Sequence, residues 1–461
     1  MSGAAAYAQN GLPALTVGER LDRLPIGPVH YRLIALIAGG LFVDVYDQTL
    51  AGAVLATMVK SGESNLALNG WFLSSTFLGL MVGAWVAGIM SDRLGRRVSF
   101  QINLLIFGVF SLAAVAAPSM QWLIGLRFLM SIGLGAEVVV AAATLMEFVP
   151  AAKRGRMVAA LSLCSPVSTL FANLVGSWLI PIAGWQVMFL IAGVGAMIVW
   201  VMRKNMPESP RWLESQGRYD EAEAITRMVE GASYQPAAKI GAAIASVPPS
   251  IPTSVLFSSG VLKLSILAIC LNIAVQSTVW ILNGWLPSFL VKQGLTVSSS
   301  LAFAALLSIG SIGGTLLAIA TVDRIGRKPG IIGASLLGIA ASGWFPYANG
   351  PAQAVLIGMV MSACIYYLLS VIFYVYVGEI FPTEFRQRGV GLGIASGRII
   401  LVLSPYLIVP MFGWGGTQAV FGLVVGMLVF TIVVIAAIGI ETRGRSLEAI
   451  SRGVGGTNPT G

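Results

Sequence analysis

Charged side chains inside long apolar runs are the residues of this sequence best suited to chemistry. Asp44 and Asp47 lie in the middle of the apolar run 31–58. Their spacing of three residues places both carboxylates on one face of a helix. Two carboxylates this close resist ionising together, so one of them is expected to hold a proton near neutral pH. The pair is a candidate proton-coupling site, and a hydrogen-bonded tie between helices is the alternative.

Two further charges, Arg127 and Glu137, occupy the apolar run 121–146. Arg127 is expected to be the counter-ion of Asp44 or Asp47, and a fixed ion pair that only sets helix packing is equally open. Glu137 is expected to act either as a second proton carrier or as a structural partner. Charges at this depth cost about 2.5–3.5 kcal/mol each on insertion scales, which makes them functional by default.

Arg398 lies near the middle of the apolar run 389–411, on a stretch rich in small residues and without an evident acidic partner in its own half of the chain. Its planar guanidinium suits a carboxylate held by two hydrogen bonds. The residue is therefore expected to bind an anionic substrate. Hydrogen bonds to helix-end carbonyls, or a pair with an aspartate of the other half, are the alternatives.

The elements that carry these charges are predicted to be membrane spans. Of the 461 residues, 56% are hydrophobic and 10% are charged, against about 25% charged residues in soluble domains. Continuous apolar runs of roughly 20 residues are long enough to cross a bilayer as helices and exclude a membrane β-barrel. Twelve such runs lie near 31–58, 70–90, 98–118, 121–146, 156–180, 185–203, 262–290, 299–320, 330–347, 351–378, 389–411 and 416–440. No cleavable signal peptide is expected.

Composition also argues against several other functions. The chain has one histidine and three isolated cysteines, so neither a zinc site nor a disulfide framework is expected, and no cofactor or enzymatic activity is predicted. The net charge of +9 comes mostly from short loops and lacks the basic–aromatic stripe of a nucleic-acid-binding protein. Almost all lysines and arginines fall on one set of loops, whereas Lys60 and Lys292 lie on the other. The positive-inside rule therefore predicts a multi-pass protein of the inner or plasma membrane with both termini in the cytoplasm.

An internal repeat divides the chain into halves. The segment 92–97 reads DRLGRR, and the segment 323–328 reads DRIGRK, 231 residues later; EFVP at 147–150 returns as EIFP at 379–382. Paired halves with a site at their interface are a transporter architecture. The predicted organisation is an N-terminal tail (1–30), a six-helix bundle (31–203), a cytoplasmic loop (204–261), a second six-helix bundle (262–440) and a C-terminal tail (441–461).

Polar and aromatic residues of the second half are expected to complete the site. Gln276 takes the position that Asp44 holds in the first half, and Asn272 is a neighbour of the same polar type. Tyr374 belongs to a group of aromatic residues in the run 351–378 that could stack on an aromatic ring. A lipid-facing belt is the alternative for these aromatic residues.

Several motifs resemble the major facilitator superfamily. GxxxDRxGRR at 88–97 and RFLxxxG at 127–133 look like its signatures, and PESPRWL at 207–213 with ETRGRSL at 441–447 resembles the sugar-porter branch. The resemblance implies an all-α membrane protein of twelve transmembrane helices in two pseudo-symmetric six-helix bundles. Two sugar-porter elements are absent, since 275–279 reads VQSTV and 370–376 reads SVIFYVY. DxxD at 44–47, GAE at 135–137, WLP at 285–287 and GR at 397–398 instead resemble aromatic acid:proton symporters and niacin-type transporters.

Charged residues at the loop ends are expected to form a cytoplasmic gate. Asp92 is expected to pair with Arg96 and Arg97, Glu147 with Arg154, and Asp323 and Glu379 with Arg386, so that the two halves are latched together in an outward-facing state. Positive-inside topology alone is the alternative. The predicted gate comprises Gly88, Asp92, Arg93, Gly95, Arg96, Arg97, Glu147, Arg154, Asp323, Arg324, Arg327, Glu379 and Arg386.

These features predict a secondary active transporter that couples protons to a small organic anion, such as an aromatic carboxylate, by alternating access. Its expected partners are the substrate, protons and the lipid bilayer, and one chain is expected to function as a monomer. A proton-coupled sugar or polyol porter and an efflux pump are alternatives within transport. A membrane sensor that does not transport and a membrane enzyme are the alternatives from other classes.

Overall fold

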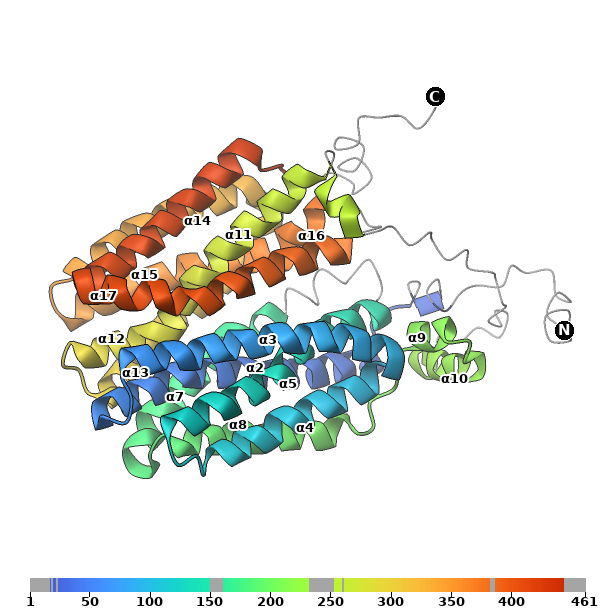
Figure 1. Ribbon diagram of the computed structural model, residues 1–461. Helices are drawn as coiled ribbons and strands as arrows, with labels where there is room; N and C mark the ends of the chain where they lie inside the picture. Colours follow the sequence, from blue (N-terminus) through green and yellow to red (C-terminus); the bar gives the residue numbers. More distant parts are fainter. Residues whose placement is uncertain are drawn as a thin grey trace, which may run out of the picture.

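The structure is a computed structural model that describes residues 17, 20–21, 24–149, 161–231, 253–258, 261–381 and 386–442. Helices and loops make up these described ranges, and no strand occurs in them. The helices form two groups that lie against each other along their length (Figure 1). The first group contains α2 (Pro28–Ser61), α3 (Leu66–Leu94), α4 (Arg96–Ala114), α5 (Met120–Phe148), α7 (Cys164–Ala183) and α8 (Gln186–Arg203).

The second group repeats this pattern with interruptions inside its helices. Two π-helical segments, η4 and η6, continue α11 and α15 without a break in the helix. The elements are α11 (Leu262–Trp280), η4 (Ile281–Trp285), α12 (Leu286–Lys292), α13 (Val297–Ile325), α14 (Arg327–Trp344), η5 (Phe345–Tyr347), α15 (Pro351–Leu368), η6 (Leu369–Tyr376), α16 (Val377–Ile380) and α17 (Arg386–Ile438). In the chain, the two groups are connected by a segment that contains α9 (Pro210–Ser215), α10 (Tyr219–Glu230) and η3 (Thr253–Phe257), and α9 and α10 lie beyond one end of the first group (Figure 1).

The number of spans agrees with the sequence prediction. Ten helices of the described residues are long and apolar enough to cross a membrane. The last of them covers two predicted spans, because Gly415 and Gly416 have non-helical backbone angles that divide α17. Together with the 29 residues of α5, the spans number twelve.

Two ends of the molecule can be distinguished by their loops. We call the end that carries Arg96 and Arg327 the basic end, and the end with the loops 62–65 and 293–296 the distal end. The turns at the basic end need glycine, because Gly95 and Gly326 have φ angles of 89° and 98°. Both residues separate two consecutive spans, so they occupy equivalent places in the two halves.

The two halves touch each other near the distal end. The Ser74 hydroxyl of α3 donates to the Val402 carbonyl of α17 at 2.7 Å, and the Ser298 hydroxyl of α13 donates to the Ser177 carbonyl of α7 at 2.7 Å. Gly52 of α2 lies directly against the backbone of η4, where a Cβ atom would collide with the Asn283 carbonyl oxygen. These contacts close the distal end.

The N-terminal segment is fastened to the helices between the halves. Arg20 is buried and forms ion pairs with Glu223 at 2.6 Å and Glu230 at 2.7 Å, both on α10. Burial disfavours the ionised form of Glu223, but its hydrogen bonds from Arg20 and Arg227 outweigh this and hold its pKa below the usual value. Val17 and Leu21 are fully buried in the same apolar cluster as Trp212 and Val229.

Candidate functional site

A cavity of about 370 Å³ lies between the two halves. Its wall extends toward the basic end as far as Leu161, Gly378 and Val390, which lie close to the basic ends of their helices. Because the distal contacts are closed, the structure is open toward the basic end. The other wall residues are Leu41, Asp44, Val45, Gln48, Thr49, Phe77, Leu80, Ala141, Cys164, Ser165, Gln276, Val279, Trp280, Asn283, Leu369, Phe373, Tyr374, Ile394, Arg398 and Leu401.

Asp44 and Arg398 bring opposite charges to this wall from different halves. Asp44 is only 2% exposed, and its Oδ1 accepts a hydrogen bond from Gln48 Nε2 at 2.7 Å. Arg398 is 9% exposed, and its Nη1 donates to the Leu80 carbonyl of α3 at 3.0 Å. Leu80 lies in the middle of α3, so this carbonyl is not at a helix end as the alternative for Arg398 supposes, and Arg398 also faces the cavity. An anion in the cavity would meet the guanidinium beside an ionisable carboxyl group.

Asp47 and Arg127 form a separate buried pair. Arg127 Nη1 lies 2.6 Å from Asp47 Oδ2, and both side chains are fully buried. Arg127 also donates to the Thr76 hydroxyl at 3.0 Å and to the backbone carbonyl of Asp47 at 3.2 Å. Neither Asp47 nor Arg127 belongs to the cavity wall. The pair thus joins α2, α3 and α5 behind the cavity, a contact that belongs equally to both expectations for Arg127, the counter-ion and the fixed ion pair.

Glu137 forms an ion pair with an arginine of the same half. Its Oε1 lies 2.7 Å from Nη2 of Arg203, the last residue of α8, and both side chains are almost completely buried. Gly40 leaves an opening in α2 for the pair, and a Cβ atom at that position would collide with both side chains. In the sequence, this opening could have been inferred from Gly40, which lies one helical turn from the intramembrane residue Asp44.

A polar chain crosses the site from one half to the other. Asn283 Nδ2 donates to the Tyr366 hydroxyl at 3.0 Å, which lies 3.5 Å from the Thr169 hydroxyl. The Thr169 hydroxyl is in turn 3.3 Å from that of Thr49. Thr49 and Asn283 both face the cavity. Gln276 also lies in the wall, so the cavity offers amide and hydroxyl groups besides its charges.

Aromatic rings line two sides of the cavity. Phe77 of α3 and Trp280 of α11 meet edge to face with centroids 4.7 Å apart. Phe373 and Tyr374 of η6 are arranged in the same way at 5.0 Å. Tyr374 lies in the cavity wall, and these rings offer flat apolar surface to a planar ring.

Asn272 is the predicted substrate-binding residue that the structure places elsewhere. Its Nδ2 donates to the Ala268 carbonyl at 2.9 Å, and the side chain is buried between α11 and α17 against Gly393. It is absent from the cavity wall. Asn272 and Gln276 lie one turn apart on the same face of α11, but the side chain of Asn272 is taken up by its contacts with the Ala268 carbonyl and Gly393, whereas Gln276 reaches the cavity wall.

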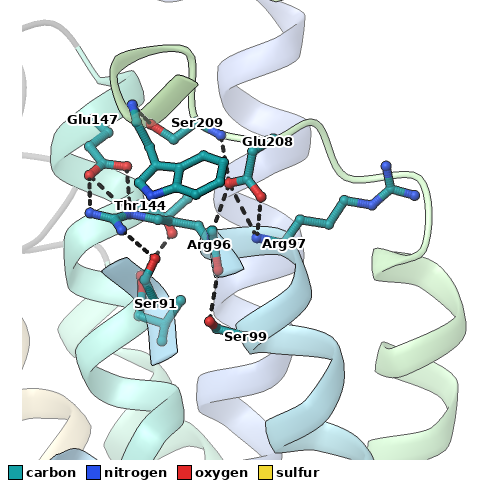
Figure 2. A network of polar contacts seen from close by, with 11 residues as sticks. Ser91, Arg96, Arg97, Ser99, Thr144, Glu147, Glu208 and Ser209 are labelled. Carbon is teal, nitrogen blue, oxygen red and sulfur yellow. Dashed lines mark hydrogen bonds and ion pairs between the residues drawn. The ribbon is translucent and has the colours of Figure 1, made fainter. Parts of the chain in front are cut away.

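At the basic end, the predicted gate residues form a charge cluster in the first half. Arg96 Nη2 lies 2.8 Å from Glu147 Oε1 (Figure 2). Glu208 accepts the backbone N–H groups of Arg96 at 2.8 Å and Arg97 at 3.1 Å, at the positive end of the α4 dipole. Arg93 is exposed. This cluster joins α4, α5 and the segment before α9 within one half.

The second half repeats the cluster. Arg327 bridges Asp323 at 3.0 Å and Glu379 at 2.6 Å. Glu441 accepts the backbone N–H groups of Arg327 at 3.1 Å and Lys328 at 2.9 Å. The pairs of Arg96 with Glu147 and of Arg327 with Asp323 and Glu379 each stay within one half, and the predicted latch between the halves stays a prediction for the other conformation. Arg324 is exposed, Arg154 lies outside the described residues, and so do the side chains of Asp92 and Arg386 and the surroundings of Gly88.

Twelve membrane helices in two pseudo-symmetric groups around a central cavity define a major facilitator transporter, not an enzyme. The chain belongs to the sugar (and other) transporter family, whose model matches residues 33–453. It is 34% identical to the inner membrane metabolite transport protein YdjE of Escherichia coli K12 over 94% of this chain and 98% of that protein.

A second relative belongs with this assignment, and a solved structure shares the fold. It is 31% identical to the niacin transporter NiaP of Acinetobacter baylyi, over 94% of this chain and 99% of that protein. The fold is similar to the partially occluded inward-open conformation of the xylose transporter XylE from E. coli, with a TM-score of 0.76 and 19% identity over 91% of this chain and 100% of that one.

Proposed function

We propose that the protein is a proton-coupled symporter of a small organic anion with an aromatic ring. The observation that carries the proposal is the meeting of Asp44 and Arg398 in the wall of one cavity between the halves. A guanidinium has five N–H donors in a planar fork that matches a carboxylate. Arg398 binds the substrate carboxylate, while Trp280 and Tyr374 offer surface to the ring.

The coupled proton is assigned to Asp44. This carboxyl group faces the cavity, whereas Asp47 lies behind it in its ion pair with Arg127. With a proton on Asp44, the wall carries less negative charge and the anion enters more readily. When Asp44 loses the proton, the restored charge favours release of the anion. Asp47, Arg127 and Glu137 support this step by holding α2 in place.

Alternating access follows from relative motion of the segments 31–203 and 262–440, which we treat as two bodies joined by 204–261. Lysine and arginine are concentrated at the basic end, so we assign that end to the cytoplasm and the protein to the plasma membrane. Both termini then lie in the cytoplasm. One chain supplies the whole cavity, which supports a functional monomer.

The likeness to a niacin transporter supports an aromatic carboxylate as substrate, because niacin is a pyridine carboxylic acid. Gln276, Asn283 and Thr49 in the wall favour a sugar or polyol as the second candidate, since amides and hydroxyls bind sugar hydroxyls well. The two candidates differ in their need for Arg398. The positive charge of Arg398 adds nothing to the binding of an uncharged sugar.

The test is uptake of labelled nicotinate, benzoate and xylose into proteoliposomes with and without an inward proton gradient. We expect gradient-driven uptake of an acid that Asp44→Asn abolishes and that Arg398→Gln weakens at least about tenfold, the loss of one charge-assisted hydrogen-bonded pair. The exposed distal charges Lys60 and Glu63 provide matched controls as Lys60→Gln and Glu63→Gln. Uptake of xylose but of no acid would overturn the proposal in favour of the sugar porter.

A further inference from the structure

The buried Glu137–Arg203 pair lies on the same face of α2 as the proton-binding residue. Leu36, Gly40 and Asp44 follow one another at intervals of four residues, so they stand in one row on the helix. Arg203 Nε and Nη2 donate to the Leu36 carbonyl at 3.0 and 2.9 Å. The carboxylate of Glu137 fills the space beside Gly40, one turn from Asp44.

Arg203 is held in this place from several sides. Its guanidinium lies over the Phe100 ring of α4, 4.3 Å from the ring centroid. Its side chain is 0% exposed, although it is the last residue of an apolar helix and has the length to reach water. An arginine that stays buried at a helix end must be stabilised by its partners. Here these are Glu137 and the backbone of α2.

Resting on the proposed proton symport, we propose that Arg203 is a positioning residue for the coupled proton: it neutralises Glu137 beside Gly40, so that Asp44 can release its proton into the cavity. Without Arg203, the charge of Glu137 would stand unbalanced about one turn from Asp44 and would hold the proton there. At an effective dielectric constant of about 20, a unit charge about 6 Å away changes such an equilibrium on the order of 100-fold.

The other groups around Asp44 do not replace this effect. Asp47 is neutralised by Arg127, and Arg398 lies on the opposite half, where the substrate binds it. Glu137 is therefore the acidic group near Asp44 whose negative charge is neutralised by Arg203. In the described part of the chain, the titratable and charged groups that surround Asp44 are Asp47 on α2, Glu137 on α5, Cys164 on α7, Tyr374 on η6 and Arg398 on α17.

Two transport modes separate a coupling role from a structural one. Accumulation driven by a proton gradient needs release of the proton, whereas exchange of labelled for unlabelled substrate can proceed with the proton still bound. We expect Arg203→Gln to reduce accumulation at least about tenfold and to leave exchange within about threefold of the unsubstituted protein. Arg203→Gln/Glu137→Gln, which removes both charges, is expected to restore accumulation to within about threefold.

Lys204→Gln is the matched control, because it removes the adjacent cation, which lies over the Trp200 ring instead of contacting Glu137. Equal loss of accumulation and exchange in Arg203→Gln, or no recovery in the double variant, would show a purely structural role and overturn the inference. Absence of gradient-driven uptake in the unsubstituted protein would instead refute the proposed symport. Substrate-induced protection against heat, measured on each detergent-purified variant, shows whether the variant is folded.

Discussion

A methyl group at position 52 should shift this transporter away from the conformation open at the basic end. Gly52 of α2 lies against η4 of the other half, and a Cβ atom there would approach the Asn283 carbonyl oxygen more closely than 3.0 Å and Pro287 Cγ to 3.3 Å. The nearest atom is backbone, which cannot move aside as a flexible side chain would. The collision exists only while the distal end is closed.

The size of the shift follows from the cost of overpacking. Extra methyl groups in a packed interior cost about 1–3 kcal/mol. Because Gly52→Ala strains one conformation alone, the ratio of basic-open to distal-open molecules should fall by about 5- to 150-fold. Gly39→Ala is the matched control on the same helix, since its Cβ atom would have only Val199 Cγ2 at 3.7 Å, an ordinary contact. The gain in helix propensity from alanine is common to both variants and cancels.

Thiol labelling at the two ends measures this ratio. Cys164 lies in the cavity wall and should react more slowly in Gly52→Ala, with Cys270 and Cys364 replaced by serine. Ser74 is 6% exposed and contacts the other half near the distal end, so the thiol of a Ser74→Cys variant should react faster in proportion to the distal-open fraction. Equal labelling rates in Gly52→Ala, Gly39→Ala and the unsubstituted protein would refute this account of the contacts between the halves at the distal end.

Two further perturbations test the buried charges. Arg127→Gln should lower the free energy of unfolding by about 3–5 kcal/mol, since it leaves Asp47 buried without a counter-ion. Adding Asp47→Asn should recover most of that loss in thermal unfolding. Equal melting temperatures for Arg127→Gln and the unsubstituted protein would contradict this expectation. Arg20→Ala should expose the N-terminal segment and speed its proteolysis at least about tenfold, whereas Arg218→Ala on the exposed surface should not. Because the folded-state pKa of Glu223 is depressed, its contribution to this docking is present above its unfolded pKa and is lost as pH falls through the folded value, so proteolysis should also accelerate below about pH 4.

The sequence alone was sufficient for the architecture and for the identity of the important charges. Apolar runs of about 20 residues leave a helix as the way to satisfy the backbone in lipid, so the twelve spans could be located from hydropathy. The two-residue interruption at 415–416 was visible as a boundary between runs. The cost of a buried charge likewise marked Asp44, Arg127 and Arg398, whatever their partners.

Tertiary structure decided which of these charges meet. Asp44 and Asp47 differ by only about 60° around α2, and the rotation of the helix places Asp44 in the cavity wall and Asp47 against Arg127 behind it. The period of a sequence cannot show which way a helix that is apolar all round is turned. The π-helical segment η4 changes the register along its helix, which brings Asn283 into the wall. Arg203 is buried because the gap at Gly40 admits its pair with Glu137. Such a gap depends on three helices packed together, and no single segment of the sequence contains it.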